Sequence, residues 1–172
     1  MKKWIKLCMV FCMTVSLAAC STDKKPKEEK AKGFTIVDQA GRKVHFDQPA
    51  QKVVSAYYIS TSTIIGLGKK DTLVGVEMKA DKRAIYKEAA PEVVKLPAMG
   101  NKKSFNVEAC VQVNPDVVFL PAALDSYVSK LEKVNIKVVL LQPETSQDYD
   151  EAVALIAQVI GAEKKAEAYQ AY

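Results

Sequence analysis

The sequence predicts an α/β fold, with an open, mostly parallel sheet flanked by helices. Short apolar runs alternate with segments of helical periodicity from residue 53 to residue 160, the pattern of successive βα units. The run at 117–120 is apolar without interruption, as expected for a parallel strand covered on both faces. Before the first unit, apolar and polar residues alternate around a turn that contains Gly41, which predicts an N-terminal β-hairpin.

The expected elements follow one another in chain order. The hairpin occupies residues 34–46 and is closed by Pro49. Strands are expected over 53–56, 73–76, 117–120 and 137–141, and a further strand is expected to end at Leu96 and Pro97. Helices are expected over 61–67 and 82–90, and a third is expected to carry Leu124, Tyr127, Val128 and Leu131 on one face and to end at Asn135.

Two more helices carry capping signals. A short helix is expected after Asn106 as its cap, with Val107, Cys110 and Val111 facing inward. Ser146 is expected to cap a longer helix that runs up to Gly161. The buried face of this helix is predicted to comprise Ala152, Leu155, Ile156, Val159 and Ile160.

Residues 1–19 predict a signal peptide. A positively charged start is followed by an apolar run over 7–19, which is too short to span a bilayer because about 20 residues are needed. The segment Leu17-Ala18-Ala19-Cys20 resembles a bacterial lipobox, which implies cleavage before Cys20 and lipid on its thiol. The protein is therefore expected to be anchored by lipid at the extracytoplasmic face of the cell membrane. An ordinary secretory signal with an incidental cysteine is the alternative.

Composition divides the rest of the chain, residues 20–172, into three segments. Residues 20–33 begin with the lipidated Cys20 and continue as a charged tether, which cannot bury enough surface to offset an ordering cost of about 1–2 kcal/mol per residue. Residues 34–161 are sufficient for one α/β lobe with its own core. Residues 162–172 begin a further helix with no stop signal and nothing to pack on. We therefore expect a cut chain, at the start of an interlobe helix, with a C-terminal lobe missing.

Charge and cysteine usage exclude several function classes. Lys and Arg number 25 against 20 Asp and Glu, but three of the lysines lie in the first six residues, so the balance is too weak for nucleic-acid binding. Cys110 would be the lone thiol of the processed chain and His45 is its only histidine. No disulfide, metal site or Cys–His catalytic pair is therefore predicted, and Cys110 is expected to be a small buried residue. The segment Gly66-Leu67-Gly68 lacks the third glycine of a dinucleotide-binding loop, which disfavours a nucleotide-binding or flavodoxin-like enzyme.

A series of motifs occurs in a recognisable order along the chain, and the resemblance that they carry covers about residues 33–172. These are the lipobox, the tether, the hairpin segment 35–42, the strand 52–55, Leu67-Gly68 before 73–76, and 106–108 before 114–118. Together they resemble the N-terminal lobe of the binding proteins for iron-siderophore, haem and cobalamin uptake by ABC transporters. The resemblance implies two α/β lobes joined by one long helix, limited hinge motion and a ligand held between the lobes.

The candidate ligand site lies at the carboxyl ends of the strands. In an open parallel sheet, ligands bind outside these ends, where loops and helix N-termini present donors. The residues that follow the expected strands are Tyr57, Tyr58, Glu77, Met78, Lys79, Met99, Gly100, Asn101, Lys102, Pro121, Ala122 and Ala123. The two tyrosines offer flat apolar faces with polar tips, although Tyr57 is equally well explained as a core aromatic. Lys79, Arg83, Lys102 and Lys103 could meet an anionic ligand, or could be solvated surface charges. Met78 or Tyr58 could also serve as an axial metal ligand, but no direct metal site is predicted.

The function expected from this resemblance is that of a non-enzymatic solute-binding lipoprotein, acting as a monomer. Its ligand is expected to be a metal chelate, with a ferric siderophore favoured over haem or cobalamin because the loop 79–83 lacks the extra aromatic residues that some members use. Its partners are expected to be ABC permease subunits with a cytoplasmic ATPase. At the position that matches Asn-x-Glu, the resemblance implies that Glu108 meets arginines of the permease. A lipid-anchored adhesion or structural lobe without a small ligand is the alternative from another class.

Overall fold

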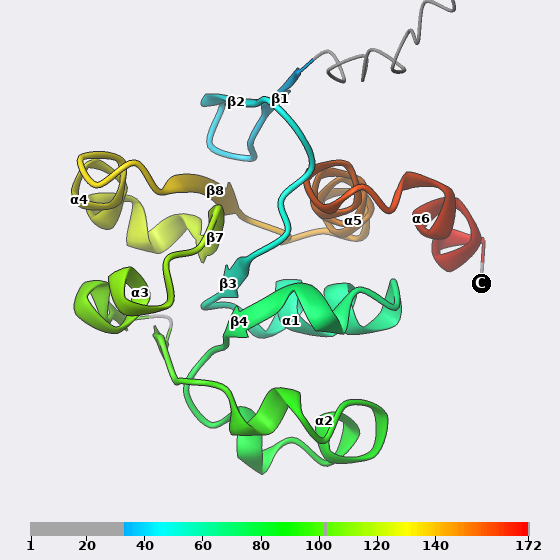
Figure 1. Ribbon diagram of the computed structural model, residues 1–172. Helices are drawn as coiled ribbons and strands as arrows, with labels where there is room; N and C mark the ends of the chain where they lie inside the picture. The colour runs from blue at the N-terminus through cyan, green and yellow to red at the C-terminus, as the bar shows by residue number, and fades with distance from the viewer. Residues whose placement is uncertain (1–32, 102, 172) are drawn as a thin grey trace, which may run out of the picture. The chain divides into compact units, whose positions relative to one another are not determined.

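One parallel sheet organises the fold of the described residues. The structure is a computed structural model that describes residues 33–101 and 103–171. The predicted signal peptide, the lipid on Cys20, nearly all of the tether and the proposed role of Lys102 therefore lie outside the described residues. The sheet of this described part has the strand order β4-β3-β7-β8 (Figure 1). Its strands are β3 (Val53–Ser55), β4 (Leu73–Gly75), β7 (Val117–Pro121) and β8 (Lys137–Leu141).

Helices cover both faces of this sheet, as the apolar sequence of its strands predicts. Val117 and Phe119 of β7 point into one core cluster, and Val118 and Leu120 point into the other. The first cluster includes side chains of α1 (Tyr58–Gly66) and α5 (Ser146–Ile160). The second includes side chains of α3 (Val107–Val113) and α4 (Val128–Glu132), which lie on the opposite side of the sheet in Figure 1. The predicted α/β class is confirmed.

The N-terminal hairpin is also confirmed, and it covers one edge of the sheet. Its strands β1 (Phe34–Val37) and β2 (Lys43–Phe46) pair antiparallel. The buried carboxylate of Asp38 accepts hydrogen bonds from the backbone N–H of Leu140 at 3.1 Å and of Arg42 at 2.8 Å. Arg42 also donates from Nη1 to the carbonyl oxygen of Val138 at 3.2 Å. The turn thereby satisfies polar groups of β8 that an open edge strand would leave unpaired.

The remaining elements lie between the βα units or, in the case of α6, after the last of them. They are α2 (Ala84–Ala89), α6 (Glu163–Gln170), the short strands β5 (Gly100–Asn101) and β6 (Ser104–Phe105), and the 3₁₀ helices η1 (Lys70–Thr72), η2 (Ala80–Lys82), η3 (Val93–Lys95) and η4 (Ala122–Tyr127). None of these helices, nor any other in the described ranges, is both long enough and apolar enough to cross a bilayer.

The expected strand ending at Leu96 and Pro97 is wrong. Only an isolated parallel bridge joins Val76 to Ala98, and Gly100–Asn101 instead pairs antiparallel with Ser104–Phe105. The physical reason is Pro97, which has no N–H and so accepts a bond from Val76 N at 3.1 Å without donating one. This segment therefore reaches the edge of β4 for one bridge and then leaves it.

Three predicted helix details are also corrected. The cap of α5 is Thr145, one residue before Ser146, because Thr145 and Asp148 form a reciprocal capping box. Val111 of α3 is 43% exposed, since the inward face of this seven-residue helix is set by Cys110. The helix expected from Leu124 onwards begins instead as the 3₁₀ helix η4, with a non-helical backbone at Leu124 (φ −105°, ψ 22°).

Helix α6 packs on the lobe, so the expectation that it has nothing to pack on is wrong. Ala166 is buried, and the hydroxyl groups of Tyr149 on α5 and Tyr169 on α6 lie 3.1 Å apart. Gln170 Nε2 donates to the carbonyl oxygen of Asp150 at 2.7 Å. The neighbouring helices α5 and α6 are visible in Figure 1. An alanine on the inward face lets α6 approach α5 closely.

Candidate ligand-binding site

The candidate site lies at the topological switch point of the sheet. From β3 the chain goes to β4 on one side, and then crosses to β7 on the other side of β3. Crevices at such reversals, outside the carboxyl ends of the strands, bind ligands in open α/β sheets. Here a cavity of about 730 Å³ lies beyond the ends of β3, β7 and β8. Its lining residues are Ala40, Tyr57, Tyr58, Ile59, Pro121, Ala122, Ala123, Asp125, Leu141, Gln142, Pro143 and Glu144.

Tyr57 and Tyr58 form the aromatic wall of this cavity. Tyr57 is the N-cap residue of α1, with an extended backbone, and Tyr58 is the first residue of the helix. Their rings meet edge to face, with centroids 5.2 Å apart and an interplanar angle of 82°. Tyr57 is 9% exposed and Tyr58 37% exposed. Burial, and after it the neighbouring Tyr58 and Glu144, raise the pKa of Tyr57, so its phenol stays protonated and can donate a hydrogen bond.

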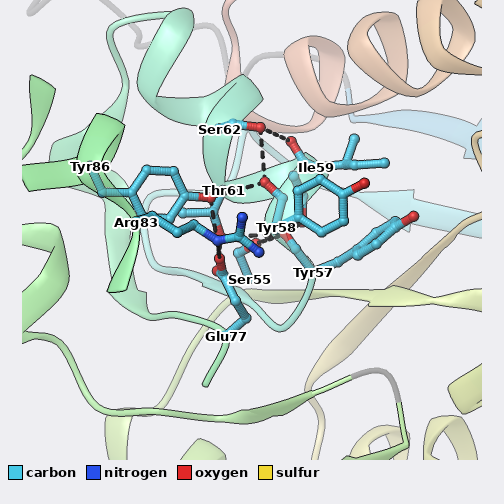
Figure 2. A network of polar contacts seen from close by, with 10 residues as sticks. Ser55, Tyr57, Tyr58, Ile59, Thr61, Ser62, Glu77, Arg83 and Tyr86 are labelled. Carbon is cyan, nitrogen blue, oxygen red and sulfur yellow. Dashed lines mark hydrogen bonds and ion pairs between the residues drawn. The ribbon is translucent and has the colours of Figure 1, made fainter. Parts of the chain in front are cut away.

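An arginine stacks on the outer tyrosine and is held by a buried acid, as Figure 2 shows. The guanidinium carbon of Arg83 lies 4.7 Å from the ring centroid of Tyr58, within cation–π distance. Arg83 Nε donates to Glu77 Oε1 at 3.0 Å. Glu77 is 5% exposed and does not line the cavity, so it acts behind the wall and does not face the ligand space.

Two hydroxyl groups complete the surroundings of Glu77. Thr61 Oγ1 donates to Glu77 Oε2 at 2.6 Å, because a carboxylate can only accept. The hydroxyl of Tyr86 lies 3.0 Å from the carbonyl oxygen of Tyr58 and 3.2 Å from Glu77 Oε1, and can donate to either. Burial, and after it the charge of Glu77, raise the pKa of Tyr86. Through Thr61 of α1, Arg83 between η2 and α2, and Tyr86 of α2, Glu77 therefore links these elements behind the aromatic wall.

Small hydroxyl groups fix the turn that carries the tyrosines. Ser55 at the end of β3 and Ser60 on α1 are fully buried, and their Oγ atoms lie 2.6 Å apart. Thr61 Oγ1 lies 2.7 Å from Ser55 Oγ, and Ser60 donates to the carbonyl oxygen of Tyr57 at 2.8 Å. Because these hydroxyl groups bond one another and the carbonyl oxygen of Tyr57, they hold the turn that carries Tyr57 and Tyr58 in place.

The structure separates the sequence-predicted residues into two groups. Tyr57, Tyr58, Pro121 and Ala122 line the large cavity, together with Ala123. Met78 and Gly100 line a second cavity of about 440 Å³, together with Asn106 and the predicted docking residue Glu108.

The other predicted residues do not line the large cavity. Lys79 and Lys103 are exposed and lie outside its lining. Asn101 accepts a hydrogen bond from the backbone N–H of Lys103 at 2.8 Å, which shapes the tip of the β5–β6 hairpin. The base nearest the aromatic wall is Arg83, through its contact with Tyr58.

Sequence reasoning missed the part of the cavity that follows β8. Leu141, Gln142, Pro143 and Glu144 lie there, and Asp125 adds a carboxylate from η4. Gln142 is held by its backbone N–H, which donates to Gln39 Oε1 at 2.8 Å. The signal was available, because these residues directly follow the apolar strand 137–141 and the rule that selected Tyr57 applies to them equally. No group of three or more metal-ligating His, Cys, Asp or Glu side chains occurs within the residues that the structure describes.

Comparison with known proteins identifies the family. The family model described as periplasmic binding protein matches residues 53–172. The chain belongs to the periplasmic binding protein family. This confirms the resemblance drawn from the order of the sequence motifs. Proteins of this family are extracytoplasmic and serve ABC transporters as solute-binding proteins.

Individual relatives share the fold at low identity. The molybdate-binding protein MolA of Haemophilus influenzae is 28% identical over 115 residues, which are 65% of this chain and 33% of MolA. A periplasmic solute-binding protein of Veillonella parvula superposes with a TM-score of 0.72 at 22% identity, over 80% of this chain and 44% of that protein. The iron-uptake ABC transporter substrate-binding protein PiuA of Streptococcus pneumoniae superposes with a TM-score of 0.66 at 20% identity, over 81% of this chain and 50% of PiuA. The chain therefore spans half or less of the length of these relatives.

Proposed function

We propose that the chain is the N-terminal lobe of a solute-binding lipoprotein that captures an iron complex, a ferric siderophore, and delivers it to an ABC permease. The observation that carries this proposal is the cavity at the switch point with its wall of two tyrosines. In the proposed protein a second lobe, reached through α6, closes over this cavity, so that the ligand is held between two walls.

The size and surface of the cavity suit a bulky, flat-faced ligand. Its volume of about 730 Å³ falls in the range of roughly 300–1,000 Å³ that is usual for small-molecule sites. The Tyr57 and Tyr58 rings, with Pro121 and Pro143, offer apolar contact, and the phenol of Tyr57 supplies a donor. PiuA, which superposes on this lobe, is by its name a substrate-binding protein for iron uptake, and this supports an iron complex as the ligand.

Two residues of the chain, Glu108 and Cys20, are proposed to serve delivery of the ligand to the permease. Glu108 is exposed in the first turn of α3, which Asn106 caps by accepting from Ala109 N at 3.0 Å. We assign Glu108 to docking on arginines of the permease. One ion pair between Glu108 and such an arginine would determine the docking register and the encounter rate of the two proteins more than their affinity. We assign Cys20 to a lipid anchor, since more than one buried acyl chain makes membrane attachment stable.

Equilibrium dialysis of the chain against four ligands tests the proposed function. The ligands are a ferric siderophore, haem, cobalamin and free molybdate, the oxyanion that MolA is named for. We expect the ferric siderophore to be retained and the binding to weaken when Tyr58 is changed to alanine. Ile85→Ala is the matched control, because Ile85 is an exposed apolar residue outside the cavity.

Each other outcome has a defined meaning. Preferential retention of haem or cobalamin would contradict the siderophore assignment but keep the solute-binding role. Preferential retention of molybdate would contradict an iron complex as the ligand. Retention of no ligand by either the chain or the two-lobed protein, with circular dichroism showing both to be folded, would favour an adhesion or structural lobe.

A further inference from the structure

The charged groups that line the large cavity are all acidic. Asp125 comes from η4, after β7, and Glu144 comes from the loop after β8. Both side chains are exposed to the cavity mouth, and no Lys, Arg or His is among the lining residues. Of the two alternatives that the sequence left open for the nearby bases, contact with an anionic ligand and solvated surface charge, this lining favours the second for Lys79 and Lys103.

Neither carboxylate is neutralised by a cation within the described part of the chain. Asp125 has no hydrogen-bond or ion-pair partner for its carboxylate among the residues 33–101 and 103–171. Glu144 Oε1 accepts from Gln142 Nε2 at 3.1 Å, but this amide is uncharged. Arg83, the base nearest the aromatic wall, is already paired with the buried Glu77 at 3.0 Å. The rim of the cavity therefore carries two uncompensated negative charges.

The field of these acids is larger than that of the nearby helix terminus. The N-terminus of α1 reaches the cavity at Tyr58, and a helix N-terminus is equivalent to roughly half a positive charge. Two full negative charges exceed this. The charge of Glu144 also reaches the aromatic wall, because it contributes, after burial and Tyr58, to the raised pKa of Tyr57.

We propose that this half of the site selects ferric complexes that carry a cationic or hydrogen-bond-donating group at their periphery, and that it disfavours free oxyanions. Asp125 and Glu144 are the specificity-determining residues, and Tyr57 and Tyr58 provide the contact surface that any bulky complex can use. The inference rests on the proposed function, which supplies the iron complex as the ligand.

A matched pair of ligands isolates the charge. Equilibrium dialysis of the chain is carried out with a ferric trihydroxamate that bears a pendant ammonium group, and with the same complex after acetylation of that amine. We expect the ammonium form to bind about five- to tenfold more tightly, as Coulomb attraction to two nearby charges through a largely aqueous medium suggests. In the double variant Asp125→Asn/Glu144→Gln, the ratio of the two affinities, that of the ammonium form over that of the acetylated form, should fall to about one. In the control Asp71→Asn/Glu151→Gln, which removes two exposed acids outside the cavity lining, the ratio should stay as in the wild type.

A ferric tricatecholate and free molybdate complete the test. We expect the anionic tricatecholate to bind more tightly to Asp125→Asn/Glu144→Gln than to the wild type. A ratio near one in the wild type, a ratio that survives in the variant, or molybdate bound in preference to the ferric complexes would overturn the inference. Binding of ferric complexes without charge preference would overturn this inference alone, whereas binding of none of them by either the chain or the two-lobed protein would also remove the proposed function.

Discussion

Replacing Glu77 tests whether the acid behind the aromatic wall stabilises the fold as its contacts indicate. The side chain is 5% exposed and has three donors close to it, from Thr61, Arg83 and Tyr86. In Glu77→Ala the hydroxyl of Thr61 loses its charged acceptor at 2.6 Å and keeps only Ser55 Oγ at 2.7 Å and the Tyr57 carbonyl oxygen at 3.3 Å, and a hydrogen bond to a charged group contributes about 1.5–3 kcal/mol. Arg83 is 40% exposed, so its guanidinium stays solvated and the loss of the ion pair costs less than for a fully buried pair.

Together these contributions give an expected loss of about 2–4 kcal/mol in the free energy of unfolding for Glu77→Ala. Glu77→Gln keeps an acceptor for Thr61 and loses only the charge, so we expect about 1–2 kcal/mol. For a chain of this size, the loss of stability expected for Glu77→Ala lowers Tm by roughly 5–12 °C.

Urea unfolding followed by far-UV circular dichroism measures these differences. Glu88→Ala on α2 is the control, because Glu88 is exposed and such surface changes usually stay within about 0.5 kcal/mol. The reasoning would be refuted if Glu77→Ala unfolded within about 0.5 kcal/mol of the wild type. It would equally be refuted if the glutamine variant lost as much stability as the alanine variant, because the charge would then carry the whole effect.

Further predictions concern one buried thiol, the aromatic wall and the two assigned surface roles. Burial raises the pKa of Cys110 to about 12, so we expect peptide mapping to find it unlabelled by a thiol reagent at about pH 8 until urea unfolds the chain; labelling of the folded chain would contradict this. Tyr57→Ala and Tyr58→Ala should each weaken iron-complex binding by about two- to tenfold in dialysis, since such aromatic contacts contribute about 0.5–1.5 kcal/mol, and unchanged affinity in both would remove the wall from the site. Glu108→Lys in the two-lobed protein should leave ligand binding unchanged and lower cellular uptake, and normal uptake would show that docking uses another residue. Cys20→Ser should abolish palmitate labelling and membrane retention, whereas a variant still found in the membrane fraction would contradict the anchor.

The fold was predictable because its signals are local. The continuous apolar run 117–120 and the alternation around Gly41 each determine one element without reference to the rest of the chain. Pro97 misled the strand assignment, because an apolar neighbourhood suggested a strand whereas the missing N–H allows only a single bridge to Val76. The cap at Thr145 was missed by one residue, since Ser146 carries the same capping chemistry.

The ligand-binding site was predictable only for residues that directly follow a predicted strand in the sequence. Tyr57 and Pro121 follow predicted strands, and both line the cavity. The loop after β8 also follows a predicted strand, but that it shares one cavity with Tyr57 and Pro121 depends on the position of β8 next to β7, which is a tertiary property. The pairing of Glu77 with Arg83 has no sequence signature either, because the two residues are brought together by the 3₁₀ helix η2 and not by a regular helix spacing.

The position of the ligand is the most direct test of the cavity as the binding site. Amide NMR spectra of the chain are recorded with a ferric siderophore and with its diamagnetic gallium analogue. We expect iron to broaden the resonances of Tyr58, Ala122 and Glu144, while those of Asp47 and Asn114, which line a separate cavity of about 310 Å³, remain sharp. Broadening that centres instead on the second cavity, around Met78, or that spares the aromatic wall altogether, would contradict the assignment of the ligand to the switch point of the sheet.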